Sequence, residues 1–369
     1  MVQAMAREFA QSDIRPIAAE IDREARFPHE TVKRMGELGL MGIAIPETWG
    51  GAGSDTVAYV VALEEIAKAC ASHAVVMSVN NSLYCDPVYK FGTDAQRERF
   101  LRPVASGHTP GCFALTEAQA GSDARNQNTL AVRDGAGYVI TGRKQFISTG
   151  REASFALVFA QTDRDRRHHG ITAFVVEKGT RGFTVSKTED KLGIRASDTA
   201  ELVFDECRVP AGNRIGEEGQ GFTIAMTTID GGRIGIAAQA VGIAQACLDA
   251  SIKYAKERQQ FGRPIADFQA IQWKLAEMAT DVDAATLLIH RAARLRDAGV
   301  PHAKEASMAK LFASTIANKA ANEAVQIHGG AGYCRDFPVE RYFRDAKITE
   351  IYEGTSEAQR MIIAKSLLK

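Results

Sequence analysis

The apolar residues of this chain change their spacing near Gly111 and change back near residue 222. Between these points they form short, often alternating runs, such as 155–159 and 171–176, separated by glycine-containing turns. Alternation with a period of two and frequent turns are typical of β-strands. On either side the apolar residues recur at helical spacing, as they do in 56–71. The sequence therefore predicts a β domain placed between two helical parts.

A chain of 369 residues is long for one hydrophobic core and suggests two or three packed sub-domains. We expect an α+β multidomain protein with an N-terminal α-helical domain over 1–110. It is followed by a middle β-barrel-like domain over 111–221 and a C-terminal four-helix bundle domain over 222–369. The Ala-rich stretch 234–254 is apolar on more than one side, which is typical of a helix buried in a bundle or a subunit interface.

Charge and motifs exclude several classes of function. Lys plus Arg and Asp plus Glu are 45 each, so no net field attracts nucleic acid or a membrane surface. We expect no apolar run long enough to cross a bilayer. There is no Gly-x-Gly-x-x-Gly and no Gly-Lys pair, which argues against a Rossmann dinucleotide site and a P-loop. No zinc-like spacing of His, Cys and Glu occurs, so no metal site is expected.

The cysteines and the N-terminus indicate a compartment. The six cysteines are scattered and are interpreted as buried thiols in a reducing environment. The first nine residues have the pattern of a helix already under way instead of a targeting peptide. We expect a bacterial cytoplasmic protein, with a mature mitochondrial matrix form as the alternative.

The stretch 351–357 near the C-terminus holds the candidate catalytic acid. Ser356 with Gln359 fits a capping box, which predicts that a helix begins at Ser356. Gly354 allows a tight turn and close approach of the backbone. Glu353 then lies at a helix N-terminus, where free N–H groups favour a negative charge. A carboxylate fixed on such a turn suits a general base; the alternative is a surface acid beside a helix cap.

Seven separated stretches, in order, carry a resemblance to a known family. They are 112–123, 144–148, 190–195, 230–234, 258–262, 326–333 and 351–357. Together they resemble the acyl-CoA dehydrogenases over the whole chain and look most like the short-chain (butyryl-CoA) members. The resemblance implies a homotetramer with FAD. It also implies α,β-dehydrogenation of a short-chain acyl-CoA thioester to the trans-2-enoyl-CoA, with electrons passed to electron-transfer flavoprotein.

The resemblance assigns the chemistry to Glu353. It implies that this carboxylate removes the α proton while the flavin takes the β hydride. The Glu353 N–H and the ribityl 2′-hydroxyl of FAD would stabilise the enolate-like oxygen. A second lineage of the family carries its base near Gly232, where this chain has no side chain to do so. The alternatives are a dehydrogenase of 2-methyl-branched, aromatic or cyclic acyl-CoA, an oxidase, or a non-catalytic flavin-binding member.

The resemblance also implies binding residues. Those along the isoalloxazine are Phe113, Leu115, Thr116, Gly121, Ser122, Phe146, Ile147 and Ser148. Further FAD contacts are Arg258, Phe261, Gln269, Gln326, Gly329, Gly330, Thr355 and Glu357. The substrate-lining residues are Ser122, Asp230, Arg233 and Gly354. Arg258 and Phe261 are expected to reach the FAD of a neighbouring subunit.

Three features weigh on these assignments. Phe146 and Ser148 stand where the family usually has Trp and Thr, which leaves an aromatic face and a hydroxyl in place. Taken singly, Phe113 and Phe146 also fit ordinary strand core. Asp230 and Arg233, three residues apart on a helix, also fit an exposed ion pair.

Overall fold

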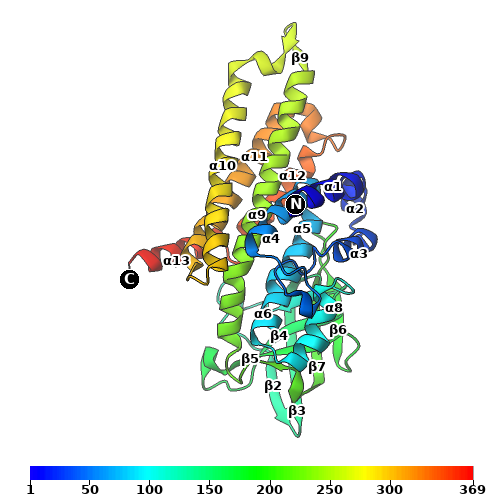
Figure 1. The fold of residues 1–369 in the computed structure, drawn as a ribbon, viewed down its shortest axis with the longest axis vertical. Coiled ribbons are helices and arrows are strands. Elements are labelled where there is room, and N and C mark those ends of the chain that lie inside the picture. The colour runs from blue at the N-terminus through cyan, green and yellow to red at the C-terminus, as the bar shows by residue number, and fades with distance from the viewer. Residues whose placement is uncertain (369) are drawn as a thin grey trace.

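The computed structural model describes residues 1–368, and Figure 1 shows a long helical bundle with a β domain at one end. The N-terminal part is helical, with short π and 3-10 turns between the α-helices. These helices are α1 (Val2–Phe9), α2 (Ala18–Glu24), α3 (His29–Glu37), α4 (Thr56–Ala69), α5 (Ala71–Ser78), α6 (Asp86–Phe91), α7 (Asp94–Gln96) and α8 (Arg102–Ala105). The Asp55 side chain accepts the Ala58 N–H and so caps α4.

The middle part is one eight-stranded sheet with the order β6-β7-β3-β2-β4-β5-β8, in which β1 pairs with β4. The strands are β1 (Gly111–Ala114), β2 (Leu130–Asp134), β3 (Gly137–Ser148), β4 (Phe155–Gln161), β5 (Ile171–Glu177), β6 (Phe183–Thr188), β7 (Thr199–Pro210) and β8 (Arg214–Ile215). β4 and β5 are buried along nearly their whole length, as expected of central strands. The predicted β domain is confirmed.

The C-terminal part is built on three long helices. The helices are α9 (Gly221–Glu257), α10 (Gln269–Asp297), α11 (Ala303–His328), α12 (Val339–Ala346) and α13 (Ser356–Leu367). A small hairpin of β9 (Gln259–Gln260) and β10 (Arg263–Pro264) joins α9 to α10. α9 lies at the centre, packed against α4, α10 and α11. Figure 1 places the β9 turn at the end of the bundle opposite the β domain.

Two expectations are corrected by the fold. We expected no apolar run long enough to cross a membrane, but α9 is long and apolar enough by length and composition alone. However, 83% of its most apolar window is buried inside the protein. It is therefore the core helix of the bundle. Five of the six cysteines are buried as expected, whereas Cys334 is exposed. It lies in the turn between α11 and α12.

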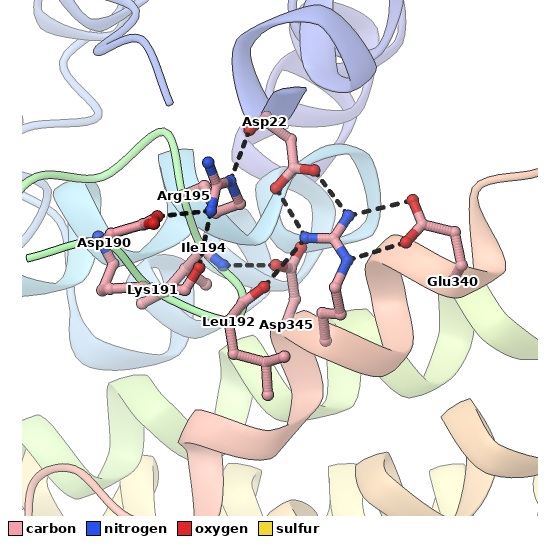
Figure 2. A network of polar contacts seen from close by, with 9 residues as sticks. Asp22, Asp190, Lys191, Leu192, Ile194, Arg195, Glu340 and Asp345 are labelled. Atoms are coloured by element: carbon pink, nitrogen blue, oxygen red, sulfur yellow. Dashed lines mark hydrogen bonds and ion pairs between the residues drawn. The ribbon is translucent and has the colours of Figure 1, made fainter. Parts of the chain in front are cut away.

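A polar junction joins the three parts of the chain (Figure 2). Arg344 on α12 donates to Asp22 of α2 at 2.7 Å, to Glu340 at 2.8 Å and to the Leu192 carbonyl at 3.2 Å. The next residue, Asp345, accepts the Ile194 N–H at 2.5 Å. Segments from the N-terminal, middle and C-terminal parts thus meet at two adjacent residues of α12.

Because Asp22 is only 8% exposed, the loss of Arg344 leaves its carboxylate buried without its ion-pair partner. We expect Arg344→Met to lower the free energy of unfolding by about 3 kcal/mol, measured by thermal and denaturant melting. The matched control is Arg34→Met, which removes an exposed pair with Glu37 at 2.6 Å and should cost less than about 1 kcal/mol. Equal effects of the two substitutions would contradict a structural role for the junction.

Candidate active site

The candidate base lies on a turn with unusual backbone angles. Glu353 has φ +52° and Gly354 has φ +94°, so two consecutive residues occupy the left-handed region. A non-glycine residue there costs about 1 kcal/mol or more and persists only when its surroundings enforce it. Here the Gly354 carbonyl accepts two hydrogen bonds, from Lys310 Nζ at 2.8 Å and from Gln359 Nε2 at 2.9 Å. These donors hold the turn in place.

The cap of the following helix differs from the expected one by one residue. α13 begins at Ser356, as predicted, but Thr355 is its N-cap and accepts the Ala358 N–H at 3.3 Å. The predicted capping box of Ser356 and Gln359 is wrong. Gln359 instead donates to the carbonyls of Glu353 and Gly354. The side chain that sequence reasoning assigned to the cap therefore fixes the turn that carries the candidate base.

The carboxylate of Glu353 points into the protein. Its Oε2 atom is buried and has no hydrogen-bond partner among residues 1–368. A Cβ on Gly232 of α9 would lie 2.1 Å from this oxygen and 2.8 Å from Leu83, so only glycine fits beside it. Burial raises the pKa of Glu353 to about 7, against the opposing effect of Lys310 and Arg233. A carboxylate with a pKa near neutrality is suited to proton transfer.

The backbone at Glu353 offers a second polar group. Within the described part of the chain, the Glu353 N–H donates to no backbone or side-chain acceptor. A backbone donor with no internal partner is uncommon away from water. The turn thus places the carboxylate and the N–H of one residue, Glu353, in the candidate site.

Asp230 and Arg233 on α9 form an ion pair. The alternative of an exposed pair is wrong, because Arg233 is only 7% exposed and its Nε has no partner in the residues described. Burial lowers the pKa of the Arg233 guanidinium, which Asp230 and Glu353 oppose. A buried guanidinium near the Glu353 carboxylate contributes positive charge to the site.

One helical turn along α9 from Gly232, other side chains fill the space next to the helix. A Cβ on Gly235 would meet Tyr59 Oη at 2.4 Å and Ser78 Oγ at 2.6 Å. Tyr59 Oη donates to Ser78 at 3.1 Å. Gly232 and Gly235 lie three residues apart, and one turn of helix rises about 5.4 Å. The space beside Glu353 is consequently shallow along α9.

The β domain contributes an aromatic and hydroxyl-bearing surface. Phe146, at the end of β3, has φ +58° and a side chain that is 59% exposed. The Gln145 N–H donates to the Thr116 carbonyl at 2.8 Å, which places the segment after β1 beside Phe146. Ser148 and Thr116 are half-buried, whereas Leu115 and Ile147 are buried. Phe113 is half-buried against Phe159, with ring centroids 4.9 Å apart.

A buried ion pair supports this surface from behind. Lys144 Nζ lies 2.7 Å from Glu117 and also donates to the Leu115 carbonyl at 3.1 Å and to Gln127 at 3.1 Å. Burial lowers the pKa of Lys144 to about 8, although Glu117 opposes the shift. Glu117 in turn accepts the Asn128 and Thr129 N–H groups at 2.7 and 3.1 Å. The pair therefore fastens the loop 115–129 to β3.

The other predicted binding residues lie apart from this surface or at its exposed edge. Gly121 and Ser122 are exposed in the loop after β1, and a Cβ on Gly121 would meet nothing within 4 Å. Thr355 is half-buried, whereas Glu357 is exposed on the first turn of α13. The remaining predicted residues are exposed near the ends of the long helices: Arg258, Phe261, Gln269, Gln326, Gly329 and Gly330. The structure of one chain does not bring Arg258, Phe261 or Gln269 to Glu353.

Sequence reasoning missed several residues at the candidate base. Lys310, Tyr59 and Leu83 have no local signal for such a role, because they come from α11, α4 and the segment after α5. The sequence indicated Gln359 only as part of a capping box. Across residues 1–368 no cluster of three or more His, Cys, Asp or Glu side chains is arranged to hold a metal ion. The site is therefore organised around one carboxylate and two buried cations.

Comparison with known proteins covers nearly the whole chain. Family models described as the N-terminal, middle and C-terminal domains of acyl-CoA dehydrogenase match residues 1–108, 112–207 and 219–368. The mitochondrial short-chain specific acyl-CoA dehydrogenase of Mus musculus is 53% identical over 369 residues, which are 100% of this chain and 90% of that protein.

Two solved structures have the same fold. Butyryl-CoA dehydrogenase from Megasphaera elsdenii superposes with a TM-score of 0.98 at 45% identity, covering 100% of this chain and 97% of that one. A chain solved in work on the electron transferring flavoprotein of Acidaminococcus fermentans gives a TM-score of 0.99 at 48% identity, with the same coverage.

We expect Lys144→Met to lower the free energy of unfolding by about 3 to 5 kcal/mol, because it leaves Glu117 buried and uncompensated. Adding Glu117→Gln should recover part of this loss, since the double variant has no buried charge at this position. Denaturant melting of the single and double variants measures the difference. Lys187→Met, which removes a pair with Glu189 formed by a 62% exposed lysine side chain, is the control. A double variant less stable than Lys144→Met would contradict the interpretation.

Proposed function

This chain belongs to the acyl-CoA dehydrogenase family, and we propose that it oxidises a short-chain acyl-CoA to the trans-2-enoyl-CoA with Glu353 as general base. Members of the family are FAD-dependent flavoprotein oxidoreductases, and the short-chain relatives act in fatty acid oxidation. The observation that carries the proposal is the buried Oε2 of Glu353, which has no hydrogen-bond partner within residues 1–368, on a turn whose N–H also finds no acceptor there.

In the proposed reaction Glu353 removes the α proton of the thioester. The carboxylate starts ionised, takes the proton from the α carbon and becomes neutral. The free N–H of the same residue donates to the carbonyl oxygen as negative charge develops on it. A base in place contributes typically 10² to 10⁴ in rate. Burial of the site keeps water from competing for these donors.

The residues of the β domain fit a flavin. The exposed ring of Phe146, the half-buried hydroxyls of Thr116 and Ser148, and the open space at Gly121 suit a flat ring with polar edges. When bound, FAD would accept the hydride from the β carbon. We propose that Phe113, Leu115, Ile147 and Ser122 complete this wall, with Thr355 and Glu357 from the start of α13.

A short acyl chain is supported by the closed end of the site. Gly232 admits the carboxylate, and one turn further along α9 Tyr59 and Ser78 fill the space beside Gly235. Leu83 closes the side next to Gly232. We propose that Asp230, Arg233 and Gly354 line the substrate path. The named relatives act on short-chain substrates, butyryl-CoA in one case.

The assembly and partners are part of the proposal. Six of the predicted FAD contacts are exposed and distant from the base in one chain: Arg258, Phe261, Gln269, Gln326, Gly329 and Gly330. We propose that a homotetramer brings some of them to a neighbour's FAD. Electron-transfer flavoprotein is the proposed acceptor. We also propose a bacterial cytoplasmic location; the free thiols suit a reducing compartment, and relatives include mitochondrial and bacterial proteins.

Anaerobic titration with butyryl-CoA tests the reaction directly. We expect the visible flavin bands of the purified protein to bleach with butyryl-CoA and to bleach less with longer acyl chains. Glu353→Gln should keep the bands and lose at least 10²-fold in the bleaching rate, because the amide cannot accept the α proton. A visible spectrum measured before and during titration gives both readouts.

The matched control is Glu350→Gln, which alters a carboxylate three residues earlier that pairs with Lys347 at 2.7 Å. It should bleach at the rate of the unaltered protein. Bleaching only by branched or cyclic acyl-CoA would keep the reaction and change the substrate. A yellow protein that no acyl-CoA reduces, or full activity in Glu353→Gln, would overturn the proposal.

The pH dependence has a definite sign. The base acts when ionised, and the pKa of Glu353 is raised by burial to about 7. We expect kcat/KM to rise with pH through about 7 and level off above it, falling tenfold per pH unit on the acid side. A pH profile with saturating acceptor measures this. A plateau that extends down to pH 5 would contradict the raised pKa.

A further inference from the structure

Lys310 on α11 is wholly buried, and burial lowers the pKa of its ammonium group to about 8, so the group is mainly charged near pH 7. Its only hydrogen bond within residues 1–368 is to the Gly354 carbonyl, at 2.8 Å. One neutral acceptor does not offset the free-energy cost of burying a charge. The burial of this lysine therefore needs a further partner, and the Glu353 carboxylate is the negative group acting most strongly on it.

We propose that Lys310 is a positioning residue for the Glu353 base: its ammonium fixes the left-handed turn at Gly354 and holds positive charge beside the carboxylate. The inference rests on the proposed function, since it assigns a supporting residue to the same base. Lys310 touches the turn and not the reacting atoms. It acts on the reaction only through Glu353.

Lys310 holds the turn through a hydrogen bond. The Gly354 carbonyl lies in the turn and accepts hydrogen bonds from two different helices. The donors are Lys310 on α11 and Gln359 on α13. Gln359 follows the turn by five residues and moves with it. Lys310 lies 44 residues earlier in the chain. It is therefore the donor that fixes the turn relative to the bundle.

Lys310 also acts on the Glu353 carboxylate through its charge. Glu353 is faced by Lys310 from α11, Arg233 from α9 and the hydroxyls of Tyr59 and Tyr352. Burial raises the pKa of Tyr59 to about 12 and that of Tyr352 well above its usual value. Both tyrosines are therefore neutral near pH 7. The two cations alone favour ionised Glu353 against its burial.

The other titratable groups near Lys310 do not account for its effect on the ionisation of Glu353. Lys310 is also faced by Arg233, Glu350 and Glu357. Glu350 pairs with Lys347. Glu357 lies beside Arg360 at the surface, and a hydrogen bond to its own backbone N–H lowers the pKa of its carboxyl. Burial raises the pKa of Asp345, eight residues before the base, to about 6. Its contribution is the same in the unaltered protein and in the Lys310 variants, and it cancels in their comparison.

Two substitutions separate the hydrogen bond from the charge. Lys310→Met removes both, whereas Lys310→Gln removes the charge and keeps a donor. We expect both to move the acid limb of the kcat/KM profile up by about 1 pH unit, the effect of losing a neighbouring opposite charge. At pH 9 we expect Lys310→Met to bleach with butyryl-CoA at least tenfold slower, and Lys310→Gln to recover part of that rate.

Stability distinguishes positioning from folding. Removing one member of a buried charged pair is destabilising when the other member stays charged, but Glu353, whose pKa burial raises to about 7, can become neutral by taking up a proton. We therefore expect Lys310→Met to lower the Tm less than Lys144→Met does and to keep the flavin content of the unaltered protein. Lys319→Met, on the same helix but 47% exposed beside Asp281, is the control and should change neither profile nor rate.

Each outcome decides the question. An unshifted acid limb in both Lys310 variants, with Glu353→Gln inactive, overturns the role of Lys310 and leaves the base assignment intact. Full activity in Glu353→Gln instead defeats the proposed function itself. A Tm lowered in both Lys310 variants together with loss of flavin assigns the lysine to folding and also overturns the proposal. A shifted limb with the flavin content retained supports it.

Discussion

The burial of one carboxylate sets the conditions for the rest of this structure. Glu353 has an oxygen with no partner among the residues described, and an isolated charge there is costly in free energy. Two buried cations, Lys310 and Arg233, reduce that cost without bonding to the oxygen. The pKa of the group consequently lies at about 7 instead of far above it. The fold must keep three charges in a fixed arrangement, and the hydrogen bond from Lys310 to the Gly354 carbonyl is one long-range contact that does so.

The backbone strain at the same turn shows how the arrangement is held. Glu353 and Gly354 both have positive φ, so the turn depends on its surroundings. α11 supports it through Lys310, and α9 supports it through Gln239, which accepts the Tyr352 hydroxyl. Gly232 keeps α9 close enough for these contacts while leaving room for the carboxylate. A bulkier residue at 232 would displace the group that the rest of the turn positions.

The sequence predicted the elements well because local spacing determines them. The short runs at 155–159 and 171–176 are β4 and β5, and the Ala-rich stretch 234–254 lies within α9. The cap was mispredicted by one residue, since Thr355 and Ser356 are both good N-caps and only the backbone angles choose between them. Lys310 was not predicted at all. A lysine in an Ala-rich helix has no local sign of burial, and its contact lies 44 residues away.

The junction in Figure 2 extends this argument from the base to the domains. Arg344 and Asp345 tie α12 to Asp22 and to Ile194, whose sequence separations are 322 and 151 residues. The loop that bears Ile194 continues into Asp198, whose carbonyl accepts the Thr149 N–H beside the Phe146 surface. Hydrogen bonds and the covalent chain therefore connect the Phe146 surface of the β domain, through α12, to the turn at Glu353. Since the proposed reaction needs the candidate base and the flavin at a fixed separation, contacts remote from both would determine whether that separation is kept.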